Sequence, residues 1–474
     1  TLAERRYLLD WEIRPALRTV PGVADVNALG GEVKTYRVTP RRDALVALGV
    51  TTADLERALR GNNRNDGAGR LSRGEEALLV RAEGADWAGW LALADAYREG
   101  RRSVNRWLAR HPEHTAMRPL PSGLEAWLET PTPDTTALLL PLSGRLANAG
   151  AAVLGGAIET LYRHYPDANT RPTLLTFDTQ AYPDAITAYR AAIEQNADVV
   201  LGPLTKAATQ QLGSLRQRPV PVIALNRPEA LPPSDAEGWS ALSLAPEDEA
   251  RQLADLAFGQ GARHALIIRP DNDWGRRMES ALQQTWLGLG GRVTTTLALT
   301  QEPSSSEQIS RAVGGYASEA RIRAVEEAFE APVEARARRR QDFDSIFLLA
   351  QDPSEARSLR PLLVFHYSGD VPVYAPSTIY SGNQNLQNRD LNDVVFVETP
   401  AVLDAVEIDR YSRLSALGRD AILTVDHQYQ AQVAAIPFLR GNTGLLTRLP
   451  NGEIERKLIP AQFAGDKITP LRLP

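Results

Sequence analysis

The side chains that could do chemistry in this chain are few and scattered. Six histidines occur, and only His111 and His114 lie close together. Two imidazoles at that spacing could share a metal ion, but they flank Pro112 where a predicted helix ends, a place more typical of cap or loop residues. The 474 residues include no cysteine, which excludes disulfides, iron–sulfur clusters and thiolate zinc sites. The sequence therefore predicts no metal site and no cofactor.

Motifs for nucleotide or nucleophilic chemistry do not occur either. The P-loop pattern GxxxxGK[ST] is absent, and the glycines at 67–69 and 288–291 do not form a dinucleotide fingerprint after a strand. Ser143 precedes a glycine but follows a leucine, so it does not form a GxSxG elbow. Asp342 and Asp344 could do acid–base work, but such a pair without a partner base more often caps or solvates a strand entrance. We expect no catalytic residues and no enzyme activity.

Composition narrows the class of protein further. Hydrophobic residues make up 43% and charged residues 23%, as in ordinary globular proteins. The net charge of −5 provides no basic field for phosphates, so nucleic acid is not an expected partner. No apolar run is long enough to span a membrane. The chain opens on Thr1 without the apolar region of a signal peptide, and we interpret this start as the inside of a longer gene.

From residue 131 onwards, strand and helix patterns alternate. Apolar strand patterns and helical patterns follow one another in two successive sets, which is typical of open parallel sheets covered by helices. The predicted strands are 136–142, 173–177, 198–201, 222–225, 264–268, 291–297, 345–349, 371–374 and 394–397. The predicted fold is α/β, with two doubly wound parallel-sheet lobes that face one another across a cleft.

Two smaller domains are expected before these lobes. Residues 1–84 alternate helix and strand patterns and form a small α+β unit. Residues 85–130 contain short amphipathic helices and run into a proline-rich linker, as would the last part of a helical-repeat array. The predicted domains are therefore 1–84, 85–130 and 131–474.

The first of these domains resembles a known family. The segments DWEIRPALRTVPGVADVNALGGEVKTYRV, LGVTTADLERAL and NNRNDGAGRL are similar to the periplasmic porter domain of heavy-metal resistance–nodulation–division efflux pumps. The resemblance stops near Gly84. It implies an efflux-porter fragment, which could not pump by itself because the chain has no membrane span.

The rest of the chain carries a second resemblance. The segments TALLLPLSGRLANAGAAV, GPLTKAATQQL, LIIRPDNDWGRRM and VYAPSTIYSG resemble type I periplasmic binding proteins, and RRRQDFDSIFLLAQDPSEARSLRPLLVFHYSGD is similar to the LpoA family. Members of that family are outer-membrane lipoproteins that activate a class A penicillin-binding protein, the bifunctional peptidoglycan synthase. The resemblance implies a non-enzymatic periplasmic regulator of peptidoglycan synthesis, and so of cell-wall biogenesis and cell shape, that acts by contact.

Two departures from that family pattern are visible. Family members begin at a lipidated cysteine and continue through helical repeats, whereas here the porter-like segment stands in their place. We therefore expect the lipid anchor to be absent from this chain. The junction near Gly84 and Ala85 has the character of a fusion of two unrelated reading frames.

The resemblance to binding proteins also suggests ligand residues in the cleft. Ser143 and Thr205 would receive a carboxylate or similar anion at a helix N-terminus, and Trp274 and Tyr380 would supply flat apolar walls. The alternative is a vestigial cleft in which these residues pack the lobes together. The aromatic run around His366 is expected to pack beneath the cleft.

A run of arginines offers a candidate partner surface. Such a run is most often a solvated helix face. The alternative hypothesis is that this arginine run forms part of the surface that binds the peptidoglycan synthase. The arginines concerned are Arg336, Arg338, Arg339 and Arg340.

Two further functions remain open at this point. A solute-binding or sensing module would use the cleft, and ligand-dependent thermal stabilisation would favour it. A fragment of a heavy-metal efflux porter is supported only by residues before Ala85.

Overall fold

The computed structural model divides the chain into two compact units, Thr1–Glu129 and Thr130–Pro474. It describes residues 89–471 except for a set of short gaps. The gaps are 91, 94, 98–100, 118–119, 121, 130–132, 231, 233–237, 331, 333, 383–385, 406, 429–438 and 450. The predicted porter-like domain, 1–84, lies outside the described residues, and the boundaries of the three domains stay predictions.

In the first unit the described residues are helical. Helices α6 (Arg101–Arg110) and α7 (Ser122–Glu129) are separated by the short η2 (Thr115–Met117). The ring of Trp107 is buried and stacks on His111 with centroids 4.6 Å apart. His111 Nδ1 lies 2.9 Å from the Trp107 carbonyl oxygen, so this imidazole caps the last turn of α6, as the sequence indicates.

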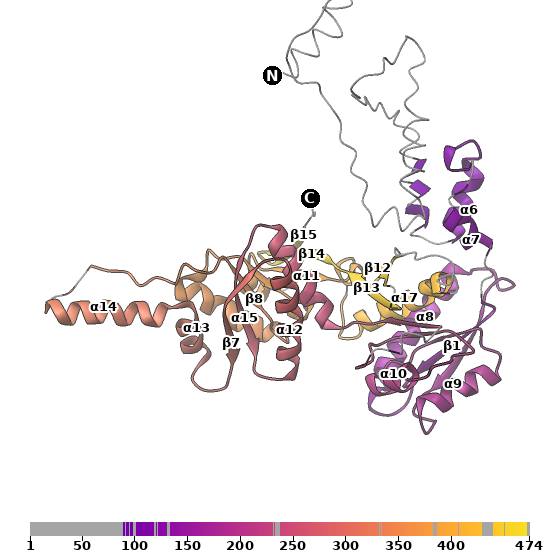
Figure 1. Ribbon diagram of the computed structural model, residues 1–474, viewed down its shortest axis with the longest axis horizontal. Coiled ribbons are helices and arrows are strands. Elements are labelled where there is room, and N and C mark those ends of the chain that lie inside the picture. The colour runs from indigo at the N-terminus through magenta and orange to yellow at the C-terminus, as the bar shows by residue number, and fades with distance from the viewer. Residues whose placement is uncertain are drawn as a thin grey trace, which may run out of the picture. The chain divides into compact units, whose positions relative to one another are not determined.

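The second unit contains two α/β lobes (Figure 1). Lobe 1 has a sheet in the order β11-β12-β13-β5-β4-β3-β1-β2. Its strands are β1 (Thr135–Leu140), β2 (Thr173–Asp178), β3 (Val199–Leu201), β4 (Val222–Ala224), β5 (Trp239–Leu242), β11 (Leu439–Arg440), β12 (Leu445–Arg448) and β13 (Glu453–Lys457). Its helices are α8 (Ala147–His164), α9 (Ala185–Glu194), α10 (Lys206–Gly213) and α17 (Ser412–Gln428), with the short η3 (Gly144–Leu146).

Lobe 2 has a sheet in the order β15-β14-β10-β9-β8-β6-β7. Its strands are β6 (His264–Pro270), β7 (Arg292–Leu299), β8 (Ser345–Leu348), β9 (Val373–Ala375), β10 (Val395–Glu398), β14 (Ile459–Ala464) and β15 (Lys467–Pro470). Its helical elements are α11 (Pro246–Gly259), α12 (Asp273–Gly288), α13 (Ser305–Val313), α14 (Gly315–Phe329), α15 (Pro353–Leu363), η4 (Val364–Ser368), η5 (Ser377–Ile379), η6 (Leu386–Leu391) and α16 (Pro400–Leu403).

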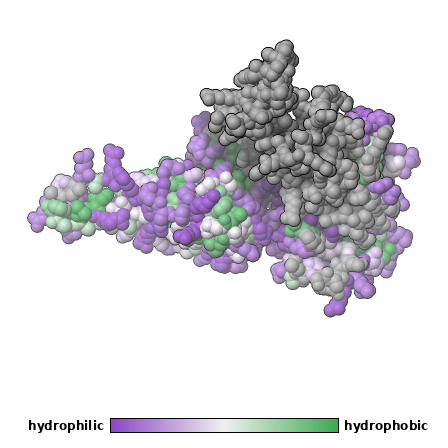
Figure 2. All heavy atoms as spheres, turned by 45° about the horizontal axis from the view of Figure 1, so that its top comes forward, coloured by the Kyte–Doolittle hydropathy of each residue, from purple (hydrophilic) through white to green (hydrophobic). Residues whose placement is uncertain are grey.

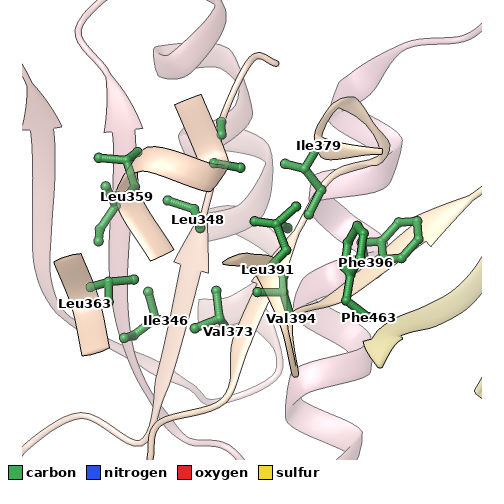
Figure 3. Close-up of a cluster of buried hydrophobic side chains, with 14 of the residues drawn as sticks. Ile346, Leu348, Leu359, Leu363, Val373, Ile379, Leu391, Val394, Phe396 and Phe463 are labelled. Atoms are coloured by element: carbon green, nitrogen blue, oxygen red, sulfur yellow. The ribbon is translucent and has the colours of Figure 1, made fainter. Parts of the chain in front are cut away.

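The central strands explain why these sheets form. Every residue of β8, β9 and β10 is buried, as expected for parallel strands covered on both faces. One face of the lobe 2 sheet packs on α13 and α15 around aliphatic and aromatic side chains (Figure 3). The other packs on α11 and α12, where Trp286 is fully buried. At about 25 cal/mol per Å² of buried apolar surface, such clusters are the main source of stability.

The prediction of parallel-sheet α/β lobes is confirmed, with two additions: strand β5 of lobe 1 and the strands at the end of the chain. The first strands of each lobe pair in parallel, whereas β11, β12, β14 and β15 join by antiparallel pairing. Because β13 pairs with β5 of lobe 1 while β14 pairs with β10 of lobe 2, the last strands return to both sheets. In the described part of the chain, the backbone passes between the sheets after β5, β10 and β13.

Candidate functional site

Ser143 and Thr205 both follow strands of lobe 1 and lie at the carboxyl edge of its sheet, as predicted. Ser143 is already engaged with Asp178, whose carboxylate accepts hydrogen bonds from the amides of Leu142 (2.9 Å) and Gln180 (3.0 Å). Burial opposes ionisation of Asp178, but the hydrogen bonds from Ser143, Gln180 and Leu142 outweigh it and hold its pKa below the ordinary value. Thr205 caps α10 by accepting from the Ala208 amide at 3.4 Å.

Trp274 and Tyr380 belong to lobe 2. Trp274 lies in the first turn of α12 and packs against the core on that side of the sheet. Tyr380 is 2% exposed, with its ring 5.3 Å from that of Phe396 and 6.2 Å from that of Phe463 between centroids. Burial raises the pKa of Tyr380 to about 12. A ring so enclosed offers a ligand little surface, and its placement agrees with the alternative in which these residues pack the protein. The ligand role of the four residues stays a prediction.

The arginine run lies in an irregular segment before β8, not on a helix. The helix-face expectation is therefore wrong, because this segment pairs with its neighbours through main-chain and side-chain bonds. The Arg338 amide donates to Ser318 Oγ at 3.1 Å, and the Arg340 amide donates to the Val313 carbonyl at 2.8 Å. Both bonds fasten the segment to α13 and α14.

The four arginines differ in how strongly they are engaged. Arg339 pairs with Asp370 at 3.0 Å, and its guanidinium lies 5.1 Å from the centroid of the Phe343 ring. Arg340 pairs with Asp342 at 2.5 Å. Arg336 and Arg338 are exposed. The cations that remain accessible to a partner are therefore at 336 and 338.

The aromatic run at 364–368 forms a π turn whose residues face in different directions. His366 is 7% exposed, and its Nε2 lies 2.9 Å from Ser306 Oγ. Phe365 is 72% exposed and Tyr367 44%, and Tyr367 has a positive φ of 65°. The expectation that this run packs beneath the cleft is wrong for the two flanking rings. A bulky residue held at positive φ is uncommon and often accompanies a functional surface.

The arginine segment and the π turn meet at the junction of α13 and α14. A Cβ at Gly314 would lie 3.3 Å from Arg340 Cβ, and one at Gly315 would lie 3.9 Å from Tyr367 Cδ2. Helix α14 continues from this junction with only Gly315 and Ser318 buried, and Figure 2 shows apolar side chains on it. We call this region the α14 surface. Its exposed side chains include the aromatic Tyr316, Phe329, Phe365 and Tyr367, the cations Arg336 and Arg338, and the acidic Glu319 and Glu327.

Charged side chains also gather where the backbone passes between the sheets. Glu398, at the end of β10, is fully buried and accepts from Arg413 of α17, with Nε at 3.1 Å. Arg413 Nη2 also donates to the carbonyls of Ser377 (3.0 Å) and Tyr380 (3.4 Å). Sequence reasoning missed this cluster. The sequence did contain one signal of a buried charge, because Glu398 directly follows the apolar residues of the predicted strand 394–397.

The sheet topology and the connections between the lobes define the class of fold. It is that of two-lobed periplasmic binding proteins. A Chromobacterium violaceum protein described as a branched-chain amino acid ABC transporter matches with a TM-score of 0.51 at 24% identity, over 69% of this chain and 99% of that one. The LpoA (YraM) C-domain from Haemophilus influenzae, a regulator of PBP1A, matches with a TM-score of 0.54 at 21% identity, over 71% of this chain and all of that one.

Sequence comparison then gives the family. Residues 71–465 match the model of the LppC lipoprotein family, and the chain belongs to that family. The penicillin-binding protein activator LpoA of Photobacterium profundum is 31% identical over 389 residues, which cover 78% of this chain and 62% of that relative. The chain thus spans less than two thirds of that relative's length. Both resemblances noted in the sequence are confirmed, since residues 1–86 match the model of the AcrB/AcrD/AcrF family.

None of the described helices is long and apolar enough to cross a membrane. This finding concerns the described residues alone.

Proposed function

We propose that the protein is a non-enzymatic activator of a class A penicillin-binding protein, and that it acts in the periplasm by direct contact. The observation that carries the proposal is the family relationship, because relatives are named as activators or regulators of such a synthase. Activation by contact requires tighter binding to the active state of the synthase than to its resting state.

The α14 surface is the contact region we propose. Interface hot spots are enriched in aromatic residues and arginine, and the α14 surface contains the exposed rings of Phe365 and Tyr367 and the accessible Arg338. Arg339 and Arg340 hold the surface in place through ion pairs, so replacing them would change the fold of the segment as well as its charge.

The test compares variants of the full chain. We expect Arg336→Glu/Arg338→Glu and Phe365→Ser each to weaken binding to a purified class A penicillin-binding protein at least about tenfold, and to reduce stimulation of its transpeptidase turnover. Arg145→Glu and Tyr162→Ser are matched controls, since both residues are exposed on lobe 1. Unchanged binding in both test variants, with circular dichroism intact, would show that the contact lies elsewhere.

A solute-binding or sensing module is the second candidate. The fold and the placement of Ser143 and Thr205 at one sheet edge favour it. A thermal-shift screen with small amphipathic carboxylates tests it. A rise in melting temperature that Thr205→Val abolishes would support solute binding, whereas no shift with any carboxylate would speak against it.

A further inference from the structure

Five charged side chains are buried on elements that adjoin the connections between the two lobes. Asp248 and Glu249 begin α11, Glu398 ends β10, Asp420 lies on α17 and Arg456 on β13, and each is at most 6% exposed. Burying a charge is costly unless hydrogen bonds and an opposite charge compensate it. The hydrogen bonds and ion pairs of each buried charge therefore show which of these side chains could form a new ion pair.

Three of the four carboxylates are firmly held. Glu398 pairs with Arg413, and Asp248 pairs with Arg227 at 3.1 Å and with Arg251 at 2.6 Å. Asp420 accepts four hydrogen bonds from the loop between β11 and β12, including those from the Asn442 amide at 2.6 Å and the Thr443 amide at 2.7 Å.

Glu249 is the exception. Among the residues that the structure describes, its carboxylate accepts from neutral donors alone, the Ser377 amide at 2.7 Å and the Ser377 hydroxyl at 3.0 Å. Burial raises the pKa of Glu249, and the positive charge that most opposes this shift is that of Arg456.

Arg456 is the complementary exception. It is 2% exposed, and one long hydrogen bond joins its Nη1 to the Thr443 carbonyl at 3.5 Å. Its Nε and Nη2 are buried without a hydrogen-bond partner among the described residues. A guanidinium normally satisfies such donors on a carboxylate in a two-pronged arrangement. Helix α11, which carries Glu249, contacts β13, which carries Arg456, and the Gln252 side chain of α11 bonds to the main chain of Leu458 next to β13 at 2.7 and 2.9 Å.

The two exceptional groups belong to different lobes. Arg456 is carried by β13 in the lobe 1 sheet, whereas Glu249 lies on α11, which packs against the lobe 2 sheet. A shift of one lobe against the other changes their separation. Ser377 belongs to lobe 2, as Glu249 does, and a carboxylate can accept from several donors, so the Glu249–Ser377 bonds leave lone pairs free for an ion pair with Arg456.

We propose that Glu249 and Arg456 form a latent interlobe ion pair, which is open in the lobe arrangement described here and closes in a second arrangement. The pair acts as a two-state switch: Ser377 bonds to the Glu249 carboxylate in the first state, and Arg456 also bonds to it in the second. This inference does not depend on which partner or ligand the protein binds.

The full chain is suited to a direct distance measurement because it has no native cysteine. Spin labels at Glu194→Cys on α9 and Gln284→Cys on α12, both exposed, report the separation of the lobes by pulsed electron paramagnetic resonance. We expect two distance populations in the otherwise unaltered chain.

Two variants are predicted to reduce one of these populations. Arg456→Met and Glu249→Gln should each reduce the second population at least about fivefold, because each removes one partner of the ion pair. Arg448→Met is the matched control, since Arg448 lies on the neighbouring strand β12 and bonds within lobe 1 to Ser240 Oγ at 2.9 Å.

A single population that none of these substitutions changes would overturn the proposal, as would equal effects of Arg456→Met and Arg448→Met. Glu249→Gln keeps the test decisive if Arg456→Met does not fold, because a glutamine oxygen can still accept from Ser377.

Discussion

At the scale of single residues, the pair of Arg413 and Glu398 has a large energetic consequence. Glu398 is fully buried, and Arg413 is the cation bonded to it. Removing one partner of a buried pair leaves an uncompensated charge, which costs more than the pair itself contributes. The same guanidinium also satisfies two carbonyl groups of lobe 2, so the loss would spread to the loop around Ser377.

We therefore expect Arg413→Met to lower the free energy of unfolding by about 3–5 kcal/mol. Denaturant unfolding followed by circular dichroism measures this change. Arg163→Met is the control, because Arg163 forms an exposed pair with Glu159 and pairs of that kind contribute at most about 1 kcal/mol. Adding Glu398→Gln to Arg413→Met should recover part of the loss. Equal effects of Arg413→Met and Arg163→Met would contradict the argument.

His366 gives a pH dependence with a definite sign. Burial lowers its pKa, so the folded protein binds a proton there less readily than the unfolded chain does. The unfolded chain then takes up more protons as the pH falls below about 6.5, and the contribution of His366 to stability is lost over that range.

We predict that the melting-temperature advantage of the wild type over His366→Gln shrinks between pH 7 and pH 5. Thermal unfolding at several pH values measures it. His264→Gln, at a half-exposed position on β6, serves as the comparison. An advantage that grows towards pH 5 would show that His366 is not held neutral.

At the scale of elements, α8 and α17 approach closely through glycines. A Cβ at Gly156 would lie 2.0 Å from the Ser415 carbonyl oxygen, and one at Gly418 would lie 1.9 Å from that of Val153. No side chain fits at either position without movement of a helix backbone. The neighbouring Gly155 is exposed and has nothing within 4 Å of such a Cβ.

Adjacent substitutions in α8 should therefore act in opposite directions. Gly156→Ala is expected to destabilise the protein by about 1–3 kcal/mol through overpacking. Gly155→Ala is expected to stabilise it by about 0.5–1 kcal/mol, because alanine favours a helix more than glycine does. The midpoints of urea unfolding compare the two. Destabilisation by both substitutions to the same extent would contradict the assigned close approach.

At the scale of the whole molecule, the two lobes share one chain but keep separate cores. All four large hydrophobic clusters are built from residues after the boundary at Glu129. We expect residues 130–474, produced alone, to melt within about 2 °C of the two-lobed part of the full chain. Differential scanning calorimetry of both proteins tests this. A markedly lower melting temperature of the shorter protein would show that residues before 130 stabilise the lobes.

The sequence by itself determined nine strands of the two lobes and, through its family motifs, the kind of fold, but β5 and β11 to β15 were not predicted. Periodic apolar residues along one segment report whether that segment becomes a strand or a helix, because burial of one face depends on local spacing. The same reasoning placed Ser143 and Thr205 correctly at strand ends. It could not show that Tyr380 is enclosed by Phe396 and Phe463, since those rings come from distant strands.

The tertiary structure alone decided which side chains face solvent and which charges meet. The arginine run is irregular because α13 and α14 supply its hydrogen-bond partners, and Phe365 is exposed because the π turn directs it outward. Glu249, Glu398 and Arg456 are far apart along the chain, and they approach only where the backbone passes between the two sheets. The physical reason is that electrostatic interaction and burial depend on distance in space, which spacing along the chain does not encode.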